Sequence, residues 1–129
     1  MIKSAEEFVE LRKSEDPEMY RRAASDTAPD SVWMDIIERY PDMRQWVAHN
    51  KTSPPRILRI LAHDPDPRVR HAVAMTRRTE ADVLELLASD SDSSVRLRIA
   101  CNKKTPKEVL LKMTEDPWER IADIAKGRL

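Results

Sequence analysis

The chain has 129 residues, a length that suits one domain with its own apolar core. Its 23 lysine and arginine residues balance 23 aspartate and glutamate residues, so no net charge attracts the chain to nucleic acid or to a membrane. No apolar run approaches the ~20 residues of a membrane-spanning helix, and the N-terminus lacks a basic segment joined to an apolar one. We therefore expect a soluble, cytoplasmic protein with no membrane partner.

The first predicted helix begins at Ser4, because SAEE over residues 4–7 has the Ser-x-x-Glu form of a capping box. We assign residues 4–28 to a degenerate N-terminal pair of helices. The next segment, 29–52, places Trp33 in a core position, where we expect it to be buried.

From residue 48 onward the chain matches itself at a spacing of 26 residues without a gap. The matching segments are AHNKTSPPRIL (48–58), AMTRRTEADVL (74–84) and ACNKKTPKEVL (100–110). A constant period of this size is typical of stacked units that cannot bury their apolar faces alone. The sequence therefore predicts one repeat domain over 1–129, with units at 29–52, 53–78, 79–104 and 105–129.

Each unit is predicted to hold two short helices. The first begins at a capping hydroxyl of Ser53, Thr79 or Thr105, with Pro54 or Pro106 at the first helical position. Its broad apolar face suggests the inner position in the stack.

The second helix of a unit begins near Asp66 or Asp92, residues that cap helices well. It ends at Asn50 or Asn102, where asparagine would permit a left-handed exit in a chain nearly without glycine. All nine prolines fall in turns or first helical turns under this assignment, giving ten helices in five pairs.

The phrases LAHDPDPRVRHAVA and LASDSDSSVRLRIA, each followed by a basic turn, resemble the variant leucine-rich repeats and HEAT-like repeats of bacterial α-solenoids. The resemblance implies an all-α, right-handed α-solenoid (superhelix) of about five short helix pairs. In variant leucine-rich repeats the second helix is a 3₁₀ helix, so we expect part of it to be 3₁₀ here. An iron–sulfur member of that family carries a cysteine cluster, which this chain lacks; we expect its single cysteine, Cys101, to be buried.

Two pairs of charged residues keep a spacing of six, Asp64 with Arg70 and Asp90 with Arg96. In HEAT-like repeats the matching residues form a structural ladder that braces one unit against the next. The alternative is a row of arginines that binds phosphates.

A second set of residues makes the turn between units basic: Lys51, Arg77, Arg78, Lys103 and Lys104. Stacked turns would lie about 10 Å apart and form a basic stripe able to bind an acidic partner. The other interpretation is structural, since cations after a helix C-terminus complement the helix dipole.

Two tryptophans fall outside the core pattern. Trp46 is a candidate anchor for a partner, although a structural role is an equal alternative. Trp118, in the last unit, is expected to cover the end of the stack.

No residue pattern supports catalysis or a cofactor. His49, His63 and His71 include no pair at i, i+4 spacing, so we expect no metal site, and the single glycine, Gly127, excludes a glycine-rich phosphate loop. HEAT-like repeats mostly bind proteins, so we expect a non-enzymatic scaffold, adaptor or regulator that binds another protein along its concave face or along the basic edge between repeats. Nucleic-acid binding through the basic turns is the alternative, and an enzyme like the alkylpurine DNA glycosylases, which are built on such repeats, is a remote one. The oligomeric state stays open.

Overall fold

The structure, a computed structural model, describes all 129 residues and contains ten α-helices, one 3₁₀ helix and no β-strand. The predicted all-α class and the number of helices are confirmed. The elements are α1 (Ala5–Lys13), α2 (Pro17–Ser25), α3 (Asp30–Arg39), η1 (Pro41–Met43), α4 (Arg44–His49), α5 (Pro55–Leu61), α6 (Pro67–Met75), α7 (Ala81–Leu87), α8 (Ser93–Cys101), α9 (Lys107–Met113) and α10 (Glu119–Gly127).

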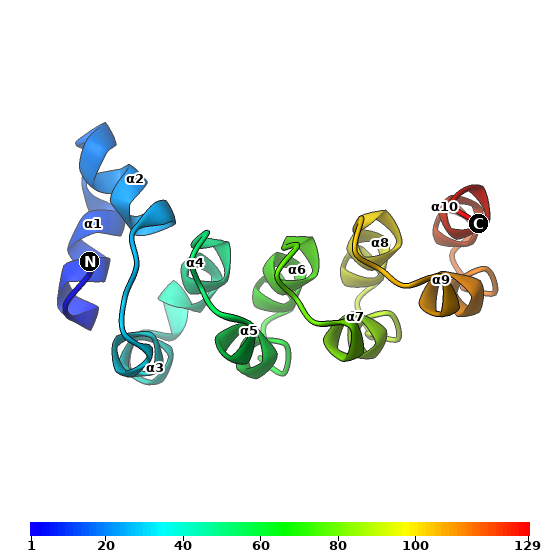
Figure 1. Cartoon of the computed structure of the whole chain (residues 1–129), viewed down its shortest axis with the longest axis horizontal. Coiled ribbons are helices and arrows are strands. Elements are labelled where there is room, and N and C mark those ends of the chain that lie inside the picture. Colours follow the sequence, from blue (N-terminus) through cyan, green and yellow to red (C-terminus); the bar gives the residue numbers. More distant parts are fainter.

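From α3 onward the helices lie in two rows (Figure 1). One row holds α3, α5, α7 and α9, which we call the first-helix row, and the other holds α4, α6, α8 and α10, the second-helix row. Consecutive helices pack as pairs, and α4, α6, α8 and α10 also pack directly on one another. One apolar core runs through all the pairs.

The expectation that the first helix of each pair is the inner one is wrong. Close contact between neighbouring pairs comes from the second-helix row, because small and β-branched residues allow its helices to approach. The residues at these contacts are at most 2% exposed: Val47, Ala48, Val73, Ala74, Ile99 and Ala100.

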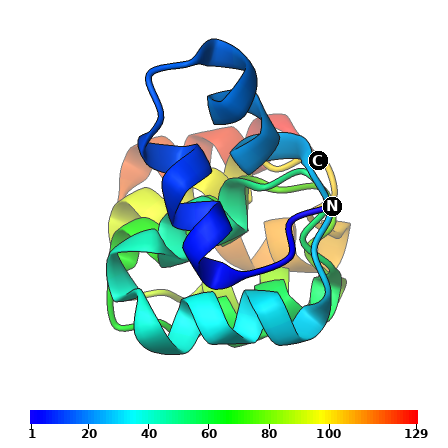
Figure 2. The ribbon, with the colours of Figure 1, turned by 90° about the vertical axis from the view of Figure 1, so that its left-hand side faces the viewer.

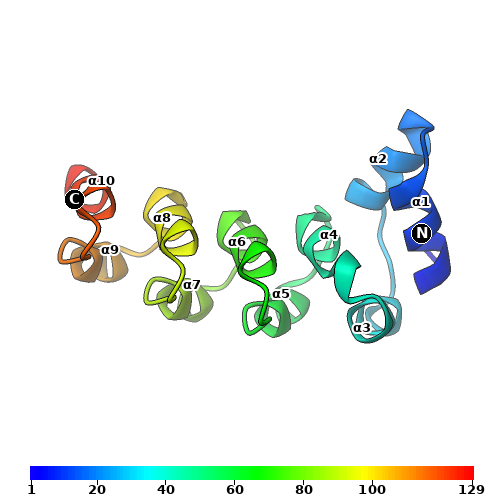
Figure 3. The same cartoon turned by 180° about the vertical axis from the view of Figure 1, so that it is seen from behind.

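The connections lie at two opposite edges of the rows. The loops that join α4 to α5, α6 to α7 and α8 to α9 gather at one edge, near both chain termini (Figure 2). The turns that join α5 to α6, α7 to α8 and α9 to α10 lie at the other edge, which faces the viewer in Figure 3. The basic residues between pairs and the aspartates within pairs are therefore on different edges.

The first pair, α1 and α2, is turned relative to the others (Figure 1). The predicted capping interaction is confirmed, since the Ser4 hydroxyl accepts a hydrogen bond from the Glu7 amide at 3.0 Å. Trp33 is buried as predicted, at 1% exposure, and its ring meets that of Phe8 edge to face at 5.6 Å. This aromatic contact joins α1 to α3.

The hydroxyls of Ser53, Thr79 and Thr105 do not cap the following helices, contrary to the prediction. The capping positions are Pro54, Glu80 and Pro106, which make no side-chain cap. Each hydroxyl instead donates backward to a carbonyl of the preceding helix, and the three bonds are Ser53 to Val47 (2.5 Å), Thr79 to Val73 (2.8 Å) and Thr105 to Ile99 (2.7 Å). The hydroxyls are buried, so they satisfy carbonyls that water cannot reach.

Two further local predictions are wrong, and a third is correct in one helix pair only. Asn50 and Asn102 leave their helices in extended conformation, with φ of −64° and −70°, and no residue has positive φ. The expected 3₁₀ part occurs only in the pair formed by α3 and α4, where η1 leads directly into α4, whereas α6, α8 and α10 are α-helical throughout. Cys101 is exposed, because it lies one position beyond the buried Ala100 on α8.

No helix of the chain combines the length and the apolar character that spanning a bilayer requires.

Candidate functional site

An ion-pair ladder lies along the edge that carries the turns within pairs. Arg70 donates to the Asp90 carboxylate from Nε at 2.8 Å and from Nη2 at 3.1 Å, and Arg96 Nε donates to Asp116 at 2.9 Å. These side chains are at most 15% exposed. Each arginine thus binds a carboxylate of the next pair of helices.

The partners differ from the spacing of six that the sequence suggested. Within that spacing the arginine meets the backbone of the aspartate: Arg70 Nη1 donates to the Asp64 carbonyl, and Arg96 Nη1 donates to the Asp90 carbonyl, both at 2.8 Å. Asp64 is bound from the preceding pair by Arg44, at 3.2 Å. Sequence reasoning missed Arg44, which stands 26 residues before Arg70 and could have been found from that spacing.

A second set of contacts ties together the loops at the opposite edge. Asn50 Nδ2 donates to the carbonyls of Ala23 (2.9 Å) and Asp26 (3.0 Å). Asn102 Nδ2 does the same for Ala74 (2.8 Å) and Thr76 (3.1 Å). The two asparagines are therefore braces between loops.

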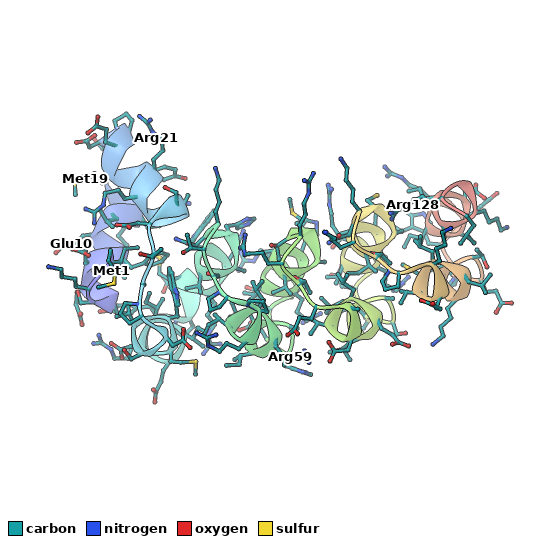
Figure 4. The ribbon with its side chains drawn as sticks, viewed as in Figure 1. Met1, Glu10, Met19, Arg21, Arg59 and Arg128 are labelled. Atoms are coloured by element: carbon teal, nitrogen blue, oxygen red, sulfur yellow. The ribbon has the colours of Figure 1, made fainter.

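Residues 76 and 128 each stand 26 positions after one of these asparagines, and neither is an asparagine. In their loops an arginine makes the bracing contacts instead. At position 76 the residue is threonine, and Arg78 reaches the previous loop instead, donating to the carbonyls of Asn50 (2.7 Å) and Ser53 (2.9 Å). At position 128 Arg128 Nη1 donates to the carbonyls of Ala100 (2.5 Å) and Asn102 (2.9 Å). Figure 4 shows Arg128 between α8 and α10.

Arg78 is therefore a structural residue rather than a free member of the basic stripe. It is half-buried, and burial lowers the pKa of its guanidinium. Its donors already have two carbonyl partners. A partner molecule would have to compete with these hydrogen bonds, so we remove Arg78 from the candidate binding residues.

We predict that Arg78→Ala lowers the free energy of unfolding by about 1.5–3 kcal/mol, because two carbonyls lose a charged donor. The neighbouring Arg77→Ala is a matched control: Arg77 is exposed and makes no ion pair, so its removal should change stability by less than about 0.5 kcal/mol. Urea denaturation of both variants measures the difference. Equal effects would show that Arg78 does not brace the loops.

The remaining predicted basic residues are exposed at one edge of the molecule: Lys51, Arg77, Lys103 and Lys104, which we call the basic edge. None of these four side chains makes an ion pair. The one contact of Lys51 with a neighbouring loop is made by its backbone amide, which donates to the Ala24 carbonyl at 2.8 Å. In the three loops the only carboxylate is that of Glu80, which Arg59 binds at 2.9 Å. The basic edge thus carries positive charge that no neighbouring acid neutralises.

Most cations of the first-helix row are paired with acids, and Lys107 is the exception. Arg59, labelled in Figure 4, binds Glu80 and Asp82, and Lys112 binds Glu85 at 2.9 Å. Such exposed pairs add little stability, but they cancel charge locally. Unpaired positive charge is therefore concentrated away from this row.

Trp46 lies on α4 at a small pocket of about 100 Å³ between the first helix pair and α4. The Arg12 guanidinium carbon lies 3.6 Å from the centre of the Trp46 ring, and His49 lies 5.5 Å from it. Sequence reasoning missed Arg12, since nothing in the pattern of α1 predicts that its side chain reaches α4.

The other aromatic and histidine residues form no comparable site. Trp118 does not cover the end of the chain as expected; it is the N-terminal capping residue of α10 and remains 37% exposed. No group of three or more histidine, cysteine, aspartate or glutamate side chains converges to hold a metal ion. Burial, followed by nearby positive charge, lowers the pKa of His49, and burial is also the main cause of the lowered pKa of His71.

Comparisons of the chain with protein-family models, with curated proteins and with solved structures found no match. The proposals below therefore depend on the residues of this chain alone.

Proposed function

We propose that the chain is a right-handed α-solenoid of 26-residue helix pairs and that it acts as a non-enzymatic protein-binding scaffold, adaptor or regulator. Contacts that recur at this interval, such as the three buried hydroxyl bonds and the ladder, support the repeat. The α-helical second helices favour the HEAT-like form over the variant leucine-rich form.

The partner that we propose is an acidic protein surface bound along the basic edge. One observation carries this proposal: Lys51, Arg77, Lys103 and Lys104 are exposed at one edge without a carboxylate partner, whereas Arg59 and Lys112 of the first-helix row are paired. Complementary charge speeds association and selects among partners. The helix dipole accounts for cations at these positions, whereas their lack of ion pairs leaves the positive charge available to a partner.

Charge reversal tests the basic edge. We expect Lys103→Glu combined with Lys104→Glu to retain helicity and to weaken capture of protein partners from a lysate by at least about tenfold. The matched control, Arg59→Glu combined with Lys112→Glu, makes the same change of charge on the first-helix row and should leave capture unchanged. If both double variants capture the same proteins as the unsubstituted chain, the basic edge is not the binding surface.

Nucleic acid is the second candidate partner, favoured by the same four exposed cations. Binding of this kind falls steeply with salt, with a log–log slope near −0.9 for each phosphate contacted. A titration with generic duplex DNA at two salt concentrations tests this candidate, because an absence of binding at low salt would remove nucleic acid as a partner. A glycosylase-like cleft would need a carboxylate beside aromatic residues, and no aspartate or glutamate lines the pocket at Trp46.

A further inference from the structure

The guanidinium of Arg12 is held between two aromatic rings. Its central carbon lies 3.6 Å from the centre of the Trp46 ring and 4.6 Å from that of the Tyr20 ring. The rings come from α2 and α4, whereas Arg12 comes from α1. Three helices therefore fix one cation in position.

Arg12 has no polar partner in this position. Its Nε atom is buried and makes no hydrogen bond, and no carboxylate forms an ion pair with the side chain. Every other half-buried arginine of the chain donates hydrogen bonds to carbonyls or carboxylates: Arg44, Arg59, Arg70, Arg78, Arg96 and Arg128. The Arg12 side chain therefore has aromatic partners but no anion to balance its charge.

The surroundings of Arg12 form a pocket rather than a filled core. The cavity has a volume of about 100 Å³ and is lined by Arg12, Tyr20, Ala23, Ala24, Trp46 and His49. No acidic side chain lines it. Glu10, the preceding carboxylate on α1, lies at the outer end of the molecule (Figure 4).

We propose that this pocket binds a single carboxylate, donated by an aspartate or glutamate side chain of the partner protein. A guanidinium offers two parallel donors that match the two oxygens of a carboxylate, and the rings already hold it in place. The inference rests on the proposed protein-binding function for the source of the carboxylate. It adds a defined anchor, separate from the basic edge.

The chemistry of the pocket favours a carboxylate over a phosphate. Arg12 is the only permanent cation in the lining, and His49 is neutral near pH 7 because burial, together with the charges of His71 and Arg12, lowers its pKa. One cation in apolar surroundings balances one negative charge, whereas a phosphate brings up to two. Stacking of a nucleic-acid base is also disfavoured, since Arg12 already covers a face of Trp46.

The test is an NMR titration of the full chain with N-acetylaspartate methylamide, with its asparagine counterpart and with inorganic phosphate. We expect the carboxylate to shift the Arg12 Nε–H and Trp46 indole signals to saturation, with an affinity in the millimolar range (~1–10 mM) for so small a probe. The amide should cause no shift, and phosphate should bind more weakly than the carboxylate. Equal shifts with the amide, or stronger binding of phosphate, would overturn the proposal.

Two variants at neighbouring positions complete the test. Arg12→Gln should weaken binding of the carboxylate by at least about tenfold. Lys13→Gln removes the same charge from an exposed position of α1 and should leave binding unchanged. If Arg12→Gln binds as well as the unsubstituted chain, the proposal fails, and should that variant not fold, the titration of the unsubstituted chain still decides.

The titration contains no partner protein, so its outcome is independent of the capture experiment with the basic-edge variants. If the carboxylate probe does not bind but the basic-edge variants lose partner capture, the basic edge remains the binding surface. If the probe binds but the unsubstituted chain captures no protein partner, the carboxylate site exists without its proposed source.

Discussion

Val73→Asp abolishes cooperative folding in this account. Val73 is fully buried on α6, where it lies between neighbouring second helices, so an aspartate there has no water and no cation to pair with. Burying an unpaired carboxylate costs more than about 4 kcal/mol, a large part of the roughly 5–15 kcal/mol by which domains are stable. Circular dichroism on heating should show a chain that is unfolded or melts without cooperativity.

Met75→Asp is the matched control on the same helix. Met75 is 47% exposed, so its aspartate stays in water and should cost only about 1 kcal/mol, from the unfavourable charge at a helix C-terminus. The corresponding pair on α8, Ile99→Asp and Cys101→Asp, should behave in the same way, because Ile99 is buried and Cys101 is exposed. Retention of the unsubstituted melting temperature by Val73→Asp would contradict the assigned packing.

The elements that could be predicted from sequence are those that local chemistry determines. Asp66 and Asp92 cap α6 and α8 as expected, each accepting a hydrogen bond from the amide two residues later. Trp33 and Val73 are buried because each falls on the apolar face of its helix. Such features need only the residues of one helical turn.

The features that sequence reasoning missed depend on distances between helix pairs. Ser53 is a capping residue type, and only the packed structure shows that its hydroxyl is directed to the Val47 carbonyl. Arg77 and Arg78 are adjacent arginines that no feature of the sequence distinguishes. In the structure only Arg78 donates hydrogen bonds to the previous loop. A residue type states what a side chain can bond, whereas the fold decides which partner is near.

The candidate binding residues likewise include some that the sequence predicts and some that only the packed structure shows. The basic edge followed from the sequence, since loops after corresponding helices must lie on one side of the rows. The pocket at Arg12 could not be predicted, because the first pair is turned relative to the others and lets Arg12 of α1 reach Trp46 of α4 in a way that no repeat spacing describes. Of the residues that line this pocket, only Trp46 falls outside the core pattern in a way that the sequence analysis noted.

The central claim is that the chain consists of equivalent helix pairs coupled by equivalent contacts. Deleting residues 79–104 should therefore preserve the fold, because it removes one whole unit and joins Arg78 to Thr105 in register. The contacts that are lost have substitutes. Arg70 would bind Asp116 in place of Asp90, and the Thr105 hydroxyl would bind the Val73 carbonyl in place of that of Ile99.

Urea denaturation of this deletion variant, followed by circular dichroism, is the most direct test of that claim. The account predicts one cooperative transition, with a dependence on urea reduced by about a fifth because one of five helix pairs is missing. Deleting residues 79–91 instead removes α7 without α8, shifts the register by half a unit and should abolish the cooperative transition. If the deletion of 79–104 also unfolds without cooperativity, or if the deletion of 79–91 is equally stable, the helix pairs are not equivalent units.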